Sequence, residues 1–172
     1  EAAGVQVRVH LKVDTGMSRV GFLYHGENPQ AVAEQMAAAC RLPALEAEGI
    51  FTHFASADEE DDGGFTRLQF DRFMDAVGRL EAMGIRFALR HCCNSAATLR
   101  YPEMHLDMVR PGIILYGLAP DGWMRDALPL QPVMELKTTV SMVKELEAGA
   151  PVSYGRIYTA PQPRTLATVP IG

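Results

Sequence analysis

The chain has 172 residues, of which 48% are hydrophobic and 22% are charged, a composition that excludes disordered, collagen-like and coiled-coil proteins. Its 16 basic and 21 acidic residues give a formal net charge of −5, and Lys and Arg form no cluster, so we expect no nucleic acid and no membrane among its partners. No stretch approaches the roughly 20 apolar residues that span a bilayer.

Cysteine usage and the chain ends add two further expectations. Three cysteines, two of them adjacent, do not make the even-numbered disulfide framework of a small secreted protein, which favours a reducing compartment such as the cytoplasm. The chain opens on Glu1 without an initiator Met and stops at Gly172 as an apolar strand begins. We therefore expect a segment of a longer protein.

The first part of the chain alternates predicted strands and helices. Apolar residues at every second position predict a strand over residues 5–13. Asn28 is a typical helix cap, and the proline after it, with apolar residues at four-residue spacing, predicts a helix that ends near Pro43. A second strand is expected over about residues 47–54, and a long helix over about residues 64–83 buries four apolar side chains: Phe70, Phe73, Val77 and Leu80.

The alternation continues with a third strand over residues 85–93, a short helix capped by Asn94, and a fourth strand over residues 106–109. This order predicts a parallel sheet covered by helices. Periodicity alone leaves two architectures open: half of an eight-stranded barrel, or an open doubly wound sheet. Prolines then mark a connection, and residues 133–146 alternate as strands do, so a second, all-β region is expected to begin near Leu130.

Residues that can bind an anion follow each of the four predicted strands. They are Lys12 and Arg19, then His53, then Asn94 and Ser95, and finally Arg110, Gly112 and Ile113. Each has an ordinary alternative as a charged turn, a core histidine or a helix cap. Because the carboxyl ends of parallel strands share one side of a sheet, the set predicts a cradle for a planar phosphorylated ligand.

Two other groups are set aside as metal sites, and no metal is expected. His91, Cys92 and Cys93 are consecutive in a predicted strand, where neighbouring side chains point to opposite faces. The acidic run over residues 59–62 lacks the alternating ligand spacing of a calcium loop. By pattern alone, Tyr154 is a half-buried strand tyrosine.

Five motifs, in order, resemble bacterial alanine racemase, a fold-type III family that depends on pyridoxal 5′-phosphate. They are Lys12–Gly21 (KVDTGMSRVG), Thr52–Ala55 (THFA), Asn94–Ser95, Met108–Ile113 (MVRPGI) and Val152–Gly155 (VSYG). The resemblance covers essentially the whole chain. It implies an α/β fold in which residues 1–125 form the second half of a (β/α)8 TIM barrel, and residues 126–172 form a linker and the beginning of a C-terminal β domain.

The resemblance also implies roles for these residues. In the family, two bases on opposite faces of the substrate remove and return its α-proton. One base is the Schiff-base lysine, and the other is a tyrosine donated across a homodimer interface, which Tyr154 matches. His53 and Arg110 match the neighbours that let this tyrosine act as a base, and Arg110 also matches the partner of the pyridine nitrogen.

The remaining matches concern the cofactor and the substrate. Arg19 matches the residue that contacts the cofactor's phenolic oxygen and the substrate carboxylate. Lys12 matches a lysine that is carbamylated in many members and orients that arginine. Asn94 and Ser95 match cofactor-binding positions, and the Ser95 side chain with the N–H groups of Gly112 and Ile113 matches the phosphate contacts.

The implied reaction is the interconversion of L-alanine and D-alanine for peptidoglycan synthesis. The Schiff-base lysine of the family would precede Glu1, and Lys12, Lys137 and Lys144 do not replace it, so the chain alone is expected to be inactive. Three alternatives stay open: a serine or broad-spectrum racemase of the same fold, a non-catalytic pyridoxal-phosphate homeostasis protein, and a half-barrel segment that self-associates without activity. Residues 130–172 argue against the homeostasis protein.

Overall fold

The structure is a computed structural model that describes residues 4–171. The chain divides into two compact units, with the division between Val133 and Met134. Each unit is described by itself. Within residues 4–171, no helix has the length and apolar character needed to cross a membrane.

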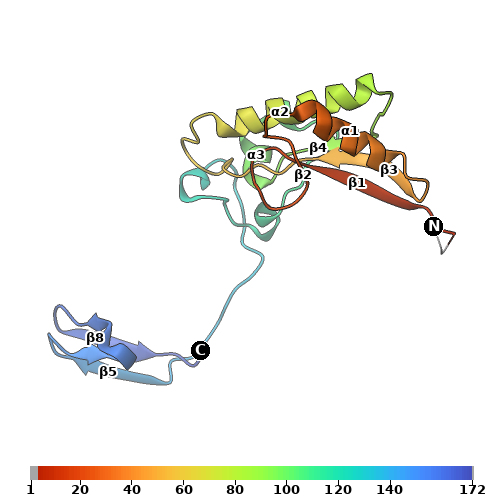
Figure 1. The fold of residues 1–172 in the computed structure, drawn as a ribbon. Helices are drawn as coiled ribbons and strands as arrows, with labels where there is room; N and C mark the ends of the chain where they lie inside the picture. Colours follow the sequence, from red (N-terminus) through yellow and green to blue (C-terminus); the bar gives the residue numbers. More distant parts are fainter. Residues whose placement is uncertain (1–3, 172) are drawn as a thin grey trace. The chain divides into compact units, whose positions relative to one another are not determined.

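A four-stranded parallel sheet lies at the centre of the first unit (Figure 1). Its strands are β1 (Val7–Asp14), β2 (Phe22–Leu23), β3 (Leu45–Phe51) and β4 (Leu89–His91), in the spatial order β2-β1-β3-β4. The pairing of β1 with β3 shifts register between Val9 and His10. Parallel strands place the loops that follow them at one end of the sheet, so the predicted site residues gather there.

Helices α1 (Pro29–Cys40) and α2 (Phe65–Ala82) lie together against one face of the sheet (Figure 1), and α3 (Ser95–Arg100) follows β4. The expected cap of α1 is confirmed, because the Ala31 N–H donates to Asn28 Oδ1 at 3.0 Å. The burial predicted from the apolar spacing of α2 is confirmed at Phe73, Val77 and Leu80. Its buried side chains are Thr66, Gln69, Phe73, Ala76, Val77 and Leu80, whereas Phe70 is only partly buried.

The predicted strand over residues 106–109 is wrong. Leu106 has a φ of 53°, which interrupts an extended backbone. The segment still runs beside β4, since Asp107 N–H donates to Arg90 O at 3.1 Å and Arg110 N–H donates to Cys93 O at 3.0 Å. Three single turns of 3₁₀ helix surround or follow it: η1 (Pro102–Met104), η2 (Ile113–Tyr116) and η3 (Gly122–Met124).

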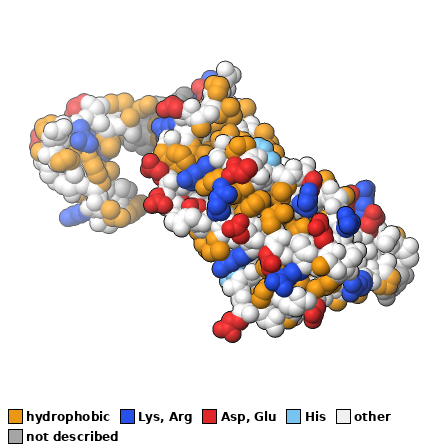
Figure 2. All heavy atoms as spheres, turned by 90° about the horizontal axis from the view of Figure 1, so that it is seen from above, with side chains coloured by type: hydrophobic (Ala, Val, Ile, Leu, Met, Phe, Trp, Pro, Cys, Tyr) orange, Lys and Arg blue, Asp and Glu red, His pale blue; other side chains and the backbone are white. Residues whose placement is uncertain are grey.

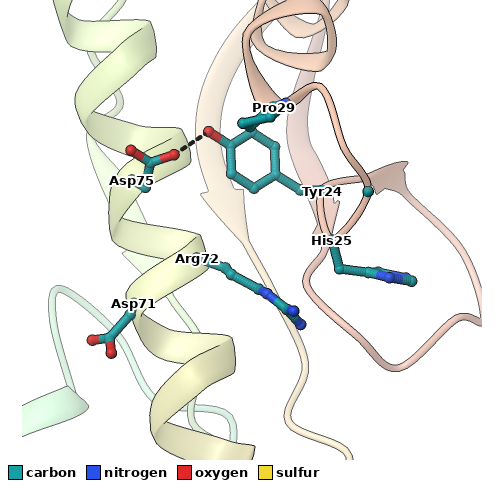
Figure 3. A pocket seen from close by; sticks show the side chains of 7 residues that line it. Tyr24, His25, Pro29, Asp71, Arg72 and Asp75 are labelled. Carbon is teal, nitrogen blue, oxygen red and sulfur yellow. Dashed lines mark hydrogen bonds between the residues drawn. The ribbon is translucent and has the colours of Figure 1, made fainter.

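Polar contacts also hold α2 to the segment between β2 and α1. In Figure 3, the Tyr24 side chain points towards α2, and its hydroxyl donates to Asp75 Oδ2 at 2.6 Å. These residues line a cavity of about 330 Å³ together with His25 and Arg72. Figure 2 shows acidic and basic side chains interspersed on the face that it presents, which gives no broad surface of one charge.

The second unit consists of two small antiparallel sheets. One pairs β5 (Met142–Leu146) with β8 (Arg164–Thr168), and the other pairs β6 (Pro151–Val152) with β7 (Tyr158–Thr159). Of the residues described from 134 to 171, Ala160 alone is buried. The predicted alternation forms a strand only from Met142 onwards, where the ladder with β8 begins.

The prediction that Tyr154 is a half-buried strand residue is wrong. Tyr154 begins a single 3₁₀ turn, η4 (Tyr154–Arg156), and is 97% exposed. Its neighbours Ser153 and Gly155 have φ values of 59° and 70°. Left-handed backbone on both sides turns the chain out of the strand and projects the tyrosine away from its own unit.

Candidate active site

A cavity of about 340 Å³ lies among the loops that follow β3 and β4. It brings together six residues that the sequence singled out. These are His53, Asn94, Ser95, Arg110, Gly112 and Ile113, with Asp58, Ala96 and Pro120 completing the wall. Residues from three separate motifs therefore share one concave site in the first unit.

Arg110 supplies a half-buried positive charge beside this cavity. Its Nη2 donates to Thr52 O at 2.9 Å, its Nη1 contacts His91 Nδ1, and its guanidinium lies 5.2 Å from the centre of the Phe51 ring. No carboxylate in residues 4–171 forms an ion pair with it. Burial lowers the pKa of Arg110, yet an arginine keeps its proton at neutral pH. The cavity therefore borders a positive charge whose hydrogen-bond partners are neutral groups.

His53 is held in its neutral form. Burial lowers the pKa of His53, and the charges of Arg110, Arg19 and Lys12 lower it further. Its Nδ1 lies 3.3 Å from Arg110 Nη2. Because a guanidinium only donates hydrogen bonds, Nδ1 is the acceptor and the ring proton sits on Nε2.

Ser95 and Gly112 are bonded to each other. The Gly112 N–H donates to Ser95 Oγ at 2.7 Å, so this N–H is already used within the chain. The Ser95 hydroxyl proton and the Ile113 N–H have no acceptor among residues 4–171. These two donors remain available to an anion in the cavity.

Asn94 serves as the cap of α3. Its Oδ1 accepts the Ala97 N–H at 3.0 Å, and its Nδ2 donates to Phe54 O at 3.4 Å. Both polar ends of the side chain are therefore engaged. Asn94 positions Ser95 and the loop after β3, and it lines the cavity.

Lys12 lies near the end of β1 and Arg19 lies on the loop that follows it, and neither residue lines this cavity. Lys12 Nζ donates to Val20 O at 2.8 Å. Burial lowers the pKa of Lys12, Asp14 opposes that shift, and Arg19 and Arg110 reinforce it. Arg19 is exposed, and in the described chain its side chain makes no hydrogen bond.

Asp14 shapes that loop. Its Oδ1 accepts the N–H groups of Gly16 at 3.1 Å and Ser18 at 2.9 Å. Burial raises the pKa of Asp14, but these two hydrogen bonds together with the charges of Lys12 and His25 leave the pKa below its ordinary value. Gly16 has a φ of 144°, and a Cβ there would lie 2.7 Å from the Phe65 ring, so the turn requires glycine at this position.

The sequence analysis missed the polar residues of α2 that hold these loops. Gln69 Nε2 donates to Thr15 Oγ1 and to His53 O, both at 3.2 Å, and its Oε1 accepts the Ala55 N–H at 2.9 Å. Arg72 Nη1 donates to Thr15 O at 2.9 Å. A signal was present, because Gln69 occupies a core position of an amphipathic helix, four residues before Phe73, where a polar side chain needs partners.

Tyr154 belongs to the second unit. There its hydroxyl makes no hydrogen bond within the described residues, and nearly all of its side chain is exposed. Its neighbour Ile157 is 94% exposed as well.

Comparison with known proteins identifies both parts of the chain. Residues 1–120 match the family model described as alanine racemase, N-terminal domain, and residues 133–172 match alanine racemase, C-terminal domain. The alanine racemase of Desulforamulus reducens is 50% identical over 173 residues, which cover 100% of this chain and 45% of that protein. That of Desulfovibrio desulfuricans is 48% identical and covers 98% of this chain and 44% of its own length.

Solved structures agree with the sequence comparison. The alanine racemase of Clostridium difficile 630 is 38% identical, with a TM-score of 0.78 over 99% of this chain and 44% of that chain. That of Streptomyces coelicolor is 38% identical, with a TM-score of 0.79 over 99% and 45%. The fold is α/β, with part of a (β/α)8 barrel followed by part of a C-terminal β domain. The chain spans about 45% of the length of the curated relatives it matches.

Proposed function

Because the chain belongs to the alanine racemase family, we propose that it forms part of an enzyme that uses pyridoxal 5′-phosphate to interconvert L-alanine and D-alanine. The observation that carries this proposal is the cavity bordered by Arg110, whose cation has no carboxylate partner in residues 4–171. We assign the activity to the complete enzyme that contains these residues.

The residues around the cavity fit a phosphorylated pyridine. The hydroxyl of Ser95 and the N–H of Ile113 would hold the phosphate. The Gly112 N–H, which donates to Ser95 Oγ, would keep that hydroxyl in position. Arg110 would face the pyridine nitrogen. When bound, the cofactor withdraws electrons from the α-carbon of the amino acid and makes its proton acidic.

Arg110 then limits how far that withdrawal goes. Its guanidinium donates a hydrogen bond but does not give up the proton at neutral pH. A pyridine nitrogen that stays unprotonated withdraws electrons less strongly than a protonated one. We expect this restraint to favour prompt return of the proton to the α-carbon, which is racemisation, over transamination.

Tyr154 would be the base on one face of the substrate. An ordinary tyrosine has a pKa near 10, so it needs a cation and hydrogen-bond donors nearby to act at neutral pH. We propose that Tyr154 reaches the cavity of a second subunit in a homodimer, where His53 and Arg110 supply those neighbours. Its 97% exposure leaves the side chain free to contact another chain.

Arg19 and Lys12 would bind the substrate side of the site. Arg19 is an exposed cation on the loop after β1, suited to an amino-acid carboxylate. The lowered pKa of Lys12 raises the fraction of neutral amine, the form that adds carbon dioxide. A carbamate at Lys12 would be an anion able to orient Arg19.

We also propose a cytoplasmic enzyme that supplies D-alanine for peptidoglycan. Its three cysteines are free thiols, which supports a reducing compartment.

The test is the formation of D-alanine from L-alanine by the complete enzyme with pyridoxal 5′-phosphate. We expect L-serine to react more slowly than L-alanine. Arg110→Leu should lower turnover by about 100-fold or more, as loss of a charged group at a reacting centre does. Arg67→Leu is the matched control, because Arg67 pairs with Glu103 on the surface. Retention of the cofactor without D-alanine formation, or faster racemisation of serine, would refute alanine racemisation.

A further inference from the structure

Four polar side chains form a continuous chain across the sheet of the first unit. Arg110 Nη1 contacts His91 Nδ1 at the end of β4. His91 Nε2 lies 2.7 Å from His10 Nδ1 on β1, and His10 Nε2 lies 3.5 Å from Glu48 Oε2 on β3. Glu48 also pairs with Arg8 at 3.0 Å. The series leads from the cavity to the middle of β1 and β3.

The chemistry of Arg110 sets the direction of every bond in this series. A guanidinium has donors only, so His91 Nδ1 must accept and a neutral His91 carries its proton on Nε2. That Nε2–H donates to His10 Nδ1, so the proton of a neutral His10 sits on Nε2 and points towards Glu48. Both imidazoles are thereby placed in the same tautomer.

His91 is held neutral by its surroundings. It is 3% exposed, and its ring stacks on Phe51 with the ring centres 5.0 Å apart and the planes 9° from parallel. Burial lowers the pKa of His91 to about 4, and the charge of Arg110 and the neighbouring His10 contribute. A second proton on His91 would turn Nδ1 into a donor facing the donor of Arg110. The chain of bonds therefore requires an uncharged ring.

The backbone of β3 leaves space for the His10 imidazole that contacts His91. His10 pairs with Gly49 of β3, directly after the register shift at Val9 and His10. A Cβ at Gly49 would lie 2.4 Å from His10 Nδ1 and 2.5 Å from its Cε1. Since the φ of Gly49 lies outside the left-handed region, space for the imidazole, not backbone freedom, is what requires glycine here.

We propose that His91 and His10 are positioning residues for Arg110, two imidazoles held in the Nε2–H tautomer by a one-directional series of two hydrogen bonds that starts at its guanidinium, with His10 Nε2–H directed at the Glu48 carboxylate 3.5 Å away. The contact with His91 engages Nη1, and Thr52 O fixes Nη2. Neutral acceptors hold Arg110 without cancelling its charge. The consequence for catalysis rests on the proposed function, whereas the tautomers are a property of the protein itself.

The first experiment reads the tautomers by ¹⁵N NMR of the complete enzyme labelled at histidine, with His91→Asn and His10→Asn used for assignment. We expect Nε2–H tautomers for both rings at pH 7.5, with and without pyridoxal 5′-phosphate. A protonated Nδ1 on either ring overturns the proposal. This readout does not depend on racemase activity, so it separates a failure here from a failure of the proposed function.

The second experiment compares two substitutions of His91, one that can preserve the acceptor for Arg110 and one that removes it. In His91→Asn the amide oxygen can replace the Nδ1 acceptor for Arg110, whereas His91→Leu removes it. We expect His91→Leu to lower kcat by roughly 10- to 100-fold with little change in KM, as loss of one hydrogen bond to a charged group does, and His91→Asn to recover most of the loss. Equal effects of the two variants would show that His91 only fills space.

The third experiment tests the next bond through Gly49. Gly49→Ala should lower kcat to the level of His10→Ala, and the double variant should be no worse than His10→Ala alone, because the added methyl acts through the imidazole. Gly78→Ala, on an open helical position with no atom within 4 Å of its Cβ, is the matched control and should leave kcat unchanged. Additive losses in the double variant would contradict the coupling.

Discussion

The two units of the chain differ in how they position the side chains to which we have assigned proposed roles. In the first unit, Arg110, His53 and Ser95 are held by hydrogen bonds from their own unit, over a core that includes the fully buried Phe73. In the second, two-stranded sheets leave nearly every side chain exposed, including Tyr154. Sheets of two strands are marginally stable by themselves.

This difference separates two kinds of residue among those with a proposed role. Arg110 acquires its orientation from local folding, so its chemistry is preorganised wherever the first unit is folded. Tyr154 has only its backbone turn to place it, so its role depends on the surface that it meets in the assembled enzyme. Stability should accordingly respond strongly to changes in the first unit and weakly to changes in the second.

The largest effect on stability is expected for Phe73→Ala. Removing this fully buried ring should cost about 3–5 kcal/mol. Tyr158→Ala, at a position that is 41% exposed in β7, should change stability by less than about 0.5–1 kcal/mol. Urea denaturation followed by the fluorescence of Trp123, the one tryptophan of the chain, measures both. Comparable losses would erase the contrast between the units.

Gln69→Leu should destabilise the first unit by about 1–3 kcal/mol, because it leaves the Ala55 N–H without its acceptor and removes a donor to the buried Thr15 side chain. Leu68→Ala, at the adjacent and 43% exposed position, is the matched control, because it changes a side chain of α2 without touching the loop contacts of Gln69. Hydrogen exchange at Ala55 should accelerate in Gln69→Leu alone. Unaltered protection of that amide would mean that Gln69 does not hold the loop after β3.

The pH dependence of stability should also distinguish the units. The pKa of His91 falls from 6.5 to about 4 on folding, so its contribution is present above pH 6.5 and is lost as pH falls towards 4. We expect about 2 kcal/mol less stability at pH 5 than at pH 7. All five histidines precede residue 134. Amide hydrogen-exchange rates, corrected for the intrinsic effect of pH on exchange, should therefore report this loss of stability in the first unit and not in β5 and β8.

The smallest effect is expected at Asp75. Hydrogen bonds from Arg79 and then Tyr24 lower the pKa of this carboxyl group, so its contribution is present above the ordinary pKa of about 3.9 and is lost as pH falls through the lowered value. Asp75→Asn should cost less than about 1 kcal/mol at pH 7, since half of the side chain is exposed. As pH falls through the lowered pKa, the difference between the variant and the wild type should shrink towards zero, and a difference that does not shrink would contradict the assignment to the carboxylate.

Local patterns predict the fold best where one periodicity dominates. Alternation in β1, and the spacing of Phe73, Val77 and Leu80 in α2, predict those elements. The strand expected at residues 106–109 fails because a single positive φ at Leu106 outweighs local β propensity. A strand as short as β2 has too few residues to show a period.

The motifs predicted the lining of the cavity, but not the side chains that support it. Whether His10 meets His91, 81 positions later, depends on the order of β1, β3 and β4 and on a register shift that no local pattern encodes. Gln69 was detectable as a polar residue at a core position. Its three partners come from two other loops and follow only from the assembled fold.

The most direct test of the contrast between the units is exchange of the α-proton of alanine in deuterated water, followed by proton NMR with the complete enzyme and each enantiomer. Since Tyr154 is assigned to one face of the substrate, Tyr154→Phe should slow exchange from L-alanine by about 100-fold or more and leave exchange from D-alanine much less affected. The spectrum of the bound cofactor should not change, because Arg110 and Ser95 are positioned by the first unit alone. Equal loss from both enantiomers, or loss of the cofactor, would contradict the account.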